Sequence, residues 1–433
     1  MDNLSGKKIF LICDPETKAH PGFLFLIDYV FAQRLNLEYQ AVHVDEPAEN
    51  QILIRYLRDL ASHENTISVY NSGYFSESNK TVNPASFVAE KPDNNIWKTD
   101  VFAAIFKALS REEEFGNFKP DQHGRFDIEA AEYAGYEAYV DRWIEQIRKQ
   151  INGLAGFEMS PKPSYKYQLT IDIDQVFSYR CKGLERNIKG GTRQLLRGDF
   201  SGFIKRKLTV LGLANDPFDM YAWLKAFCQS HQINPIIFIH AGDAGPYDKQ
   251  VNLQCTDAQE AIRYMSTFAE IGLHSSYQAA DSLSMLLLEK QRLEEILGTE
   301  VTKSRFHYLK MRLPQSYEML IEAGFSDDYT MGYASKPGFR AGTSHPFPYF
   351  NLEKNEVRPL TIHPFQVMDT TFIRYLPMTP NEAIEYTRNI AKEISELGGI
   401  LTLLVHNEMQ AGQDAWKGWS TTYEKLLKAG LLA

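Results

Sequence analysis

The chain has 433 residues, of which 44% are hydrophobic and 23% are charged, and its formal net charge is -9. These values are typical of a globular protein and exclude a largely disordered one, and the length favours two domains over a single core. The negative charge argues against a broad nucleic-acid-binding surface, which is normally basic, so we expect no nucleic-acid partner.

Residues 1–155 mix short β-type runs with amphipathic stretches. The sequence predicts strands over 8–13 and 66–71 and helices over 23–35, 97–115 and 127–152. The stretch 51–61 fits either a passage from a strand into a helix or a helix. Glycines and prolines over 153–164 stop the last helix and favour an exposed connection. We therefore expect 1–155 to form a small α/β domain of unknown role.

From 165 to 433, strand-like runs alternate with helical ones. The predicted strands are 165–173, 235–241, 270–276, 304–309, 325–330, 360–368 and 400–407, and the predicted helices are 216–231, 257–269, 281–297, 315–323 and 380–397. This alternation predicts a parallel sheet, either open or closed into a barrel. Polar residues fall at the carboxyl ends of several predicted strands, where a barrel would gather them around one mouth. We therefore favour a (β/α) barrel.

The four cysteines are far apart in sequence and form no CxxC pair, which predicts reduced thiols. The N-terminal apolar run is too short for a signal-peptide core, and no run reaches the roughly 18 apolar residues of a membrane span. We expect a cytoplasmic protein with no membrane span.

The segment TIDID, residues 170–174, places two carboxylates at the end of an apolar strand. On a continuing strand, Asp172 and Asp174 would point the same way and would repel each other unless a cation or a proton lay between them. A divalent metal bound by one carboxylate, with the other free to handle a proton, satisfies this arrangement. The alternative is a solvated pair that begins a loop.

Three histidines follow other apolar runs: His274 in GLHSSY, His307 in RFHYLK and His406 in LLVHNE. A single histidine at such a place is more often structural than a ligand. Barrel geometry would bring all three toward the aspartates, and imidazole with carboxylate suits Zn²⁺ or a similar metal. His240 and Asp243 could line the same mouth or only shape a loop, whereas His345 and His363 are better interpreted as structural or rim residues.

These motifs, together with GFSDDYTMGYASKPGFRAGTSHPF (324–347), resemble in their order the polysaccharide deacetylase-like proteins of the NodB-homology class. The likeness is greatest to a branch with an additional N-terminal α/β domain. It implies a distorted (β/α) barrel that removes acetyl groups from sugars with a divalent metal held by one Asp and two His.

Carried over by motif, the resemblance implies that Asp172 is the general base, Asp174 and His274 are metal ligands and His406 is the general acid. Arg340, in PGFRAGT, resembles an arginine that orients the base. One departure concerns the second histidine of the family's second motif, because Gln278 stands in its place. We expect His307, on the next strand end, to supply the missing imidazole.

The expected activity is therefore metal-dependent deacetylation of an acetylated carbohydrate, with zinc as the first choice of metal and cobalt or nickel as alternatives. Two other functions stay open at this point. One is a non-catalytic glycan-binding protein with a degenerate site, which Gln278 favours. The other is a metallohydrolase that acts on another amide. The sequence leaves the oligomeric state undetermined.

Overall fold

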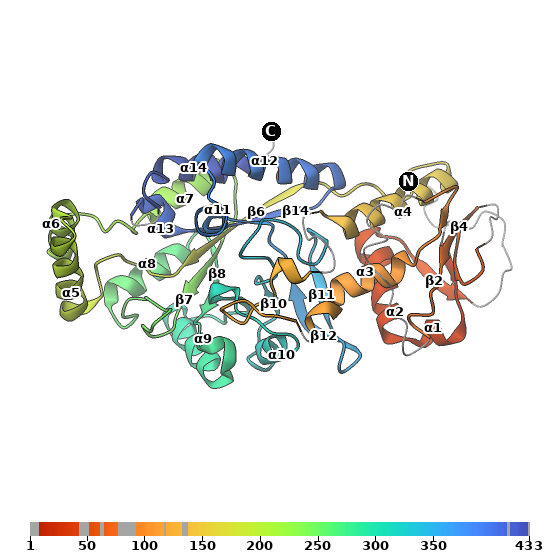
Figure 1. The fold of residues 1–433 in the computed structure, drawn as a ribbon, viewed down its shortest axis with the longest axis horizontal. Coiled ribbons are helices and arrows are strands. Elements are labelled where there is room, and N and C mark those ends of the chain that lie inside the picture. The colour runs from red at the N-terminus through yellow and green to blue at the C-terminus, as the bar shows by residue number, and fades with distance from the viewer. Residues whose placement is uncertain are drawn as a thin grey trace.

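The chain is described from a computed structural model, which covers residues 8–42, 52–60, 65–76, 92–116, 118–131, 137–413 and 416–431. Two sheets organise it (Figure 1). The smaller one, with its helices, lies at the right of Figure 1, and the larger one occupies the centre.

The first sheet has five parallel strands in the order β2-β1-β3-β4-β5. They are β1 (Ile9–Ile12), β2 (Tyr39–Val42), β3 (Ile52–Leu57), β4 (Thr66–Tyr70) and β5 (Ile96–Trp97). Their helices are α1 (Pro15–Ala19), α2 (Pro21–Ile27), the π-helix η1 (Asp28–Arg34), α3 (Val101–Ser110), η3 (Glu112–Glu114), η4 (Ile128–Ala130) and α4 (Tyr139–Ala155). The central strands are almost continuously apolar, which is typical of parallel strands buried on both faces.

Two expectations for this half are resolved. The stretch 51–61 contains the strand β3, which lies between β1 and β4 in the sheet, but the helix expected in it is absent from the described residues 52–60. The helix expected over 127–152 begins only at Tyr139. Upstream of it, Asp121 accepts hydrogen bonds from the backbone N–H groups of His123 and Arg125 and thereby holds the segment 118–131 in an irregular conformation.

The second sheet has nine strands in the order β11-β12-β10-β9-β8-β7-β6-β14-β13, and all neighbours are parallel except the antiparallel pair β11–β12. The strands are β6 (Lys166–Ile173), β7 (Ile236–His240), β8 (Glu270–Ser275), β9 (Lys303–Phe306), β10 (Asp327–Asp328), β11 (Phe347–Asn351), β12 (Glu356–Ile362), β13 (Val367–Met368) and β14 (Ile400–His406).

The sheet is not closed, in contrast to the expected barrel: its two end strands, β11 and β13, do not pair with each other. The chain itself passes from β12, beside β10, to β13, beside β14. In this link, the His363 N–H donates to the Asp328 carbonyl at 2.8 Å and the Gln366 N–H donates to the Thr402 carbonyl at 3.2 Å. Pro364 has no N–H to continue a ladder, so regular pairing stops here.

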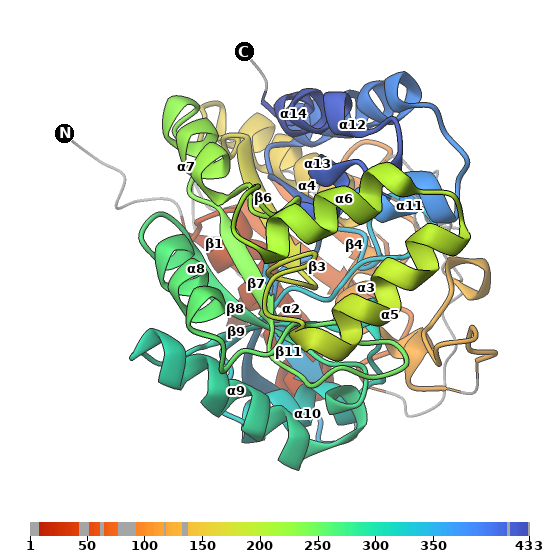
Figure 2. The ribbon, with the colours of Figure 1, turned by 90° about the vertical axis from the view of Figure 1, so that its left-hand side faces the viewer.

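Helices cover the outside of this sheet (Figure 2). Five match the predicted ones: α7 (Tyr221–Ser230), α8 (Thr256–Ser266), α9 (Leu283–Leu297), α10 (Gln315–Glu322) and α12 (Pro380–Leu397). The others are α5 (Gly183–Leu196), α6 (Phe200–Val210), η5 (Ala279–Asp281), η6 (His307–Leu309), α11 (Asp369–Arg374), α13 (Asn407–Ala411) and α14 (Ser420–Ala429). None of the helices in the described ranges is long and apolar enough to cross a membrane.

The expectation of four reduced thiols is wrong for one pair. Cys181 and Cys255 form a disulfide across a sequence separation of 74, whereas Cys13 and Cys228 are free and buried. The spacing could not reveal the pair, because only the fold brings the start of α5 beside the start of α8.

Buried ion pairs join the two halves of the chain. Glu114 of η3 accepts from Arg340 of the second half at 2.5 and 2.9 Å and from Arg111 at 2.7 Å. Asp141 of α4 pairs with Arg34 at 2.8 Å and accepts from the Thr343 hydroxyl at 2.6 Å. Glu114 therefore depends on Arg340 across the junction, whereas the ion pair of Asp141 with Arg34 lies within the N-terminal half and contacts the second half through Thr343.

We predict that Arg340→Met destabilises the protein by about 3 kcal/mol, because it removes one of two buried cations from the Glu114 carboxylate. Denaturant unfolding of the full chain measures the change. Arg388→Met is the matched control, because Arg388 is 57% exposed and should change stability little. A stable Arg340→Met protein with normal unfolding would contradict the structural role of this pair.

Candidate metal centre

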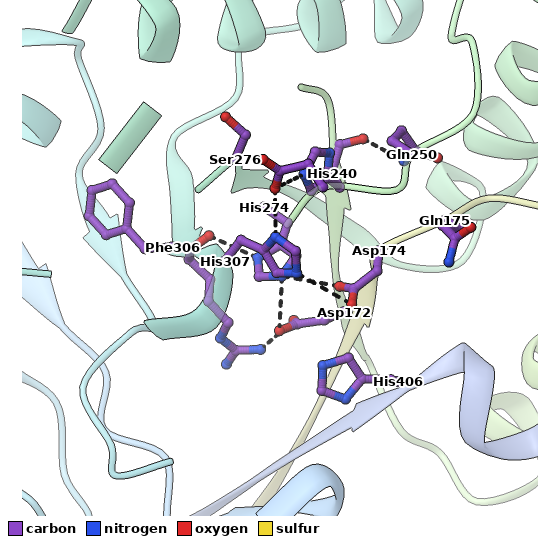
Figure 3. A network of polar contacts seen from close by, with 12 residues as sticks. Asp172, Asp174, Gln175, His240, Gln250, His274, Ser276, Phe306, His307 and His406 are labelled. Carbon is purple, nitrogen blue, oxygen red and sulfur yellow. Dashed lines mark hydrogen bonds and ion pairs between the residues drawn. The ribbon is translucent and has the colours of Figure 1, made fainter. Parts of the chain in front are cut away.

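Four strands of the second sheet deliver polar side chains to one place (Figure 3). Asp172 lies in β6 and Asp174 follows its end, His274 lies near the end of β8, His307 follows β9 and His406 ends β14. The strands are parallel and lie in the order β9-β8-β7-β6-β14, and the register pairs His406 with Asp172 directly. The carboxyl ends of parallel strands meet at one edge of a sheet, which explains why residues far apart in sequence converge.

Asp174 lies between two imidazoles. Its Oδ1 is 3.3 Å from Nε2 of His274, and its Oδ2 is 3.5 Å from Nε2 of His307. Atoms of these three residues lie within 4.8 Å of one another, which is close enough to hold a single metal ion. Asp174 Oδ1 and His274 Nε2 are buried, and neither has a hydrogen-bond partner among the described residues. Such unsatisfied buried atoms suit a cation between them.

Both imidazoles are oriented through their other nitrogen. His274 Nδ1 lies 3.0 Å from the Arg305 carbonyl, and His307 Nδ1 lies 2.8 Å from Oδ1 of Asp248. Each contact fixes the ring and leaves Nε2 directed at Asp174. A histidine that binds a metal through one nitrogen commonly donates its other N–H to a carbonyl or a carboxylate in this way.

The electrostatics of the cluster favour positive charge. Burial alone would lower the pKa of His307, but the carboxylates of Asp174 and Asp248 outweigh it and raise that pKa to about 9. Burial would likewise raise the pKa of Asp174, yet His307 and His274 hold it well below its usual range. The carboxylates thus attract a proton to an imidazole, and the same field would attract a divalent cation.

Asp248, together with His240, supports His307 at its Nδ1. Asp248 accepts from Nε2 of His240 at 2.9 Å and from the Tyr277 N–H at 3.1 Å, and these contacts keep its pKa low despite burial. His240 is fully buried, so it does not line the mouth as one of the two sequence interpretations had it. Asp248 was missed, because it lies in an irregular loop where no strand end marks it.

Asp172 is held by an arginine that the sequence analysis also missed. Nη1 of Arg305 donates to Oδ1 of Asp172 at 2.7 Å, while Oδ2 of Asp172 lies 3.6 Å from Nε2 of His274. Arg305 is fully buried, and its guanidinium lies 4.4 Å from the centre of the Phe238 ring. An arginine in the predicted strand directly before His307 was the available signal, because a basic side chain that is buried there needs an anion.

His406 has its own carboxylate. Its Nδ1 lies 2.7 Å from Oδ1 of Asp369 and 3.1 Å from the Thr370 hydroxyl. Burial would lower the pKa of His406, but Asp369 and the nearby Asp174 and Asp172 raise it to about 10. The His406 ring is therefore held in one orientation and favours its protonated form, and its Nε2 remains available for another contact.

A pocket opens above these groups, with aromatic and basic residues in its walls. Its lining includes Tyr247, Tyr308, Tyr375, Trp416, Arg125, Lys249 and Arg374. Arg125 belongs to the N-terminal half and donates to the Tyr308 carbonyl at 2.8 Å and to the Tyr375 hydroxyl at 3.1 Å. Tyr308 has φ of 60°, a conformation that costs energy for a residue other than glycine and is common at functional sites.

Other candidate residues lie outside this cluster, and the expectation for Arg340 needs correction. Arg340 is buried against Glu114, and Arg305 takes the place beside Asp172 that was expected of it. Gln278 is exposed and does not line the pocket. The remaining candidates make contacts elsewhere: Asp243 pairs with Arg292, His345 with the Gly398 carbonyl and His363 with Asp327.

Each comparison with known proteins that found a match covers only part of this chain. Residues 11–155 match a family of unknown function, DUF7033. No curated protein matches the chain. A Mycobacterium smegmatis protein assigned as a polysaccharide deacetylase has a similar solved structure, with 14% identity, a TM-score of 0.40 and coverage of 62% of this chain and 84% of that one. A polysaccharide deacetylase from Bacillus cereus matches with 11% identity, a TM-score of 0.32 and coverage of 62% and 87%.

We predict that the purified protein binds one divalent ion per chain and that His307→Ala and His274→Ala both lose it, since each removes one of three ligands. Asp248→Asn should weaken metal affinity by about 10- to 100-fold, because it leaves His307 in place but loosens its orientation. Elemental analysis and competition with a chelator measure these changes.

Gln278→Ala is the matched control and should bind metal as the wild type does, because Gln278 is exposed. Full metal content in His307→Ala would disprove its role as a ligand.

Proposed function

We propose that the protein is a metal-dependent hydrolase that removes acetyl groups from a carbohydrate, with a site in a distorted, incompletely paired (β/α) barrel. The observation that carries the proposal is the convergence of Asp174, His274 and His307, with Nε2 of both rings facing the carboxylate, beside Asp172 and His406. The order of sequence motifs described above supports the choice of reaction.

Asp174, His274 and His307 would hold the metal. One carboxylate and two imidazoles suit Zn²⁺, and Co²⁺ or Ni²⁺ accept the same ligands. When bound, the metal supplies Lewis acidity toward the acetyl carbonyl and lowers the pKa of coordinated water.

In this proposal, Asp172 is the general base. Its carboxylate takes a proton from the water that adds to the acetyl carbonyl carbon, while the ion pair with Arg305 keeps the carboxylate turned toward His274. Arg305 is thus a positioning residue, the role that the sequence analysis gave to Arg340.

His406 is the general acid. Asp369 holds its Nδ1, so Nε2 can give its proton to the departing nitrogen or oxygen of the sugar as the bond to the acetyl carbon breaks. The products are acetate and a free amine or hydroxyl group. The backbone N–H of Tyr308 is a candidate donor to the oxyanion that forms in between.

The pocket walls support a carbohydrate substrate. Tyr247, Tyr308, Tyr375 and Trp416 offer apolar ring faces with polar edges, which suit the alternating apolar and hydroxyl surface of a sugar. The alternative of a degenerate, non-catalytic site was based on Gln278. The position of His307 beside Asp174 and His274 supports the catalytic proposal over that alternative, because a second imidazole is available.

We predict that Asp172→Asn lowers kcat by about 10²- to 10⁴-fold while metal content stays normal, because it removes the base but no metal ligand. His406→Ala should lower kcat by a similar factor. Acetate release from N-acetylated and O-acetylated sugar oligomers measures turnover, and a panel of small cyclic amides tests the rival amide hydrolase.

Asp243→Asn, at an exposed carboxylate, is the control and should retain activity. Undiminished turnover in Asp172→Asn would refute the assigned roles. Turnover of cyclic amides alone would reassign the substrate.

A further inference from the structure

A helical hairpin projects from the body next to the site. Helices α5 and α6 form it, and they extend away from both sheets at the left of Figure 1 and face the viewer in Figure 2. Within α5 only Gly191 is buried, and within α6 only Thr209 is buried. The hairpin therefore contributes little to the core of the protein.

The hairpin is nevertheless firmly attached at its base. The disulfide from Cys181 to Cys255 ties the start of α5 to α8. Also at the base of the hairpin, Asp216 accepts hydrogen bonds from the backbone N–H groups of Ser178, Tyr179 and Arg180 at 2.7–3.0 Å. A disulfide and a buried carboxylate at the base indicate that the hairpin holds a defined place, although most of its residues are half-buried or exposed.

Both helices expose rows of large apolar side chains. Leu184 (78% exposed), Ile188 (57%) and Leu195 (39%) recur along α5, and Phe200 (64%), Ile204 (56%) and Leu208 (39%) recur along α6. Spacings of four and seven residues put each set on one side of its helix. The rows continue past α6 with Leu211, which is 70% exposed. Exposed apolar rows on both helices of one hairpin, in contrast to single scattered side chains, indicate an interaction site.

The same segment is strongly basic in an acidic protein. Residues 183–213 contain seven lysines or arginines and two acidic residues, a net charge of +5, whereas the whole chain carries -9. Arg193, Arg197 and Lys205 are exposed around the apolar rows. Because two such hairpins would repel each other, the charge disfavours self-association through this surface.

We propose that the α5–α6 hairpin docks the protein on the surface of a bilayer that contains anionic phospholipid. Helices with exposed leucine, isoleucine and phenylalanine side chains beside lysine and arginine bind such surfaces: the apolar row enters the acyl boundary and the cations contact lipid phosphates. At 14 and 11 residues, α5 and α6 are too short to span a bilayer, so the contact is peripheral.

Docking would also place the pocket near the membrane. Lys182, at the start of α5, donates to Oε1 of Gln175 at 2.6 Å, and Nε2 of Gln175 donates to Glu408 at 2.7 Å. Gln175 and Glu408 both line the pocket. The base of the hairpin and the candidate site are thus linked through the contact between Lys182 and Gln175, whatever reaction the site performs.

The test is co-sedimentation of the full-length protein with vesicles of phosphatidylcholine alone or mixed with phosphatidylglycerol. We expect binding to the anionic vesicles, weaker at high salt, and little binding to the neutral ones. The triple variant Arg193→Glu, Arg197→Glu and Lys205→Glu should lower partitioning by at least about 100-fold. Its control, with the same change in net charge, is Lys162→Glu, Lys392→Glu and Lys425→Glu, at exposed lysines outside the hairpin.

A second pair of variants tests the apolar row. Leu184→Ser with Ile204→Ser should reduce binding while every charge is retained, whereas Leu287→Ser with Leu288→Ser, at exposed leucines of α9, should not. Circular dichroism checks that each variant is folded. Absence of wild-type binding to anionic vesicles would overturn the proposal, as would equal effects of the hairpin variants and their controls. A dimer that forms without lipid and is lost in the Leu184→Ser, Ile204→Ser protein would assign the surface to a second copy instead.

Discussion

The arrangement of the larger half of the chain depends on a half-buried carboxylate that faces two imidazoles. Asp174 lies within 3.3–3.5 Å of both His274 and His307, in a place where a negative charge without compensation would be strongly unfavourable. Three strand ends must meet for this contact to exist, so the parallel order β9-β8-β7-β6 is a requirement of the site as much as of the core. Positive charge at this point, from a proton or a metal ion, relieves the repulsion between Asp174 and its neighbour Asp172.

Each group around that contact has a partner from a different segment. Arg305 holds Asp172, Asp248 holds His307 and Asp369 holds His406, all at 2.7–2.8 Å. Breaking any one of these pairs would leave a buried polar group without its partner, so the site and the folded state are coupled. Each partner contacts one polar atom of an imidazole or carboxylate, and the second polar atom of that group stays free for a ligand.

The sequence could predict the strand ends but not these partners. Asp172, Asp174 and the three histidines each follow an apolar run, and parallel strands necessarily bring such positions together. Asp248 lies in a loop and Asp369 at the start of a short helix, where no periodicity marks them. Arg340 was misplaced because a motif fixes its residue type, whereas its contact with Glu114 depends on how the two halves pack. The disulfide and the projecting hairpin were missed for a similar reason, since sequence distance says nothing about which cysteines meet, and helical periodicity does not reveal whether a partner covers the apolar side.

The N-terminal half bears directly on the site, although the motifs lie elsewhere. His123 packs against Tyr308 with ring centres 4.8 Å apart, and Arg125 binds the Tyr308 carbonyl, so the segment 118–131 supports Tyr308 and contributes Arg125 to the pocket lining. Asp121 fixes this segment locally, and the buried pair of Glu114 with Arg340 anchors it to the second half a few residues upstream. A change in the packing of the two halves would therefore displace Tyr308 more directly than it would displace Asp174 or His274 at the strand ends. The physical consequence is that the N-terminal half can influence the shape of the candidate pocket, while the strand ends of the second half supply its ionisable groups.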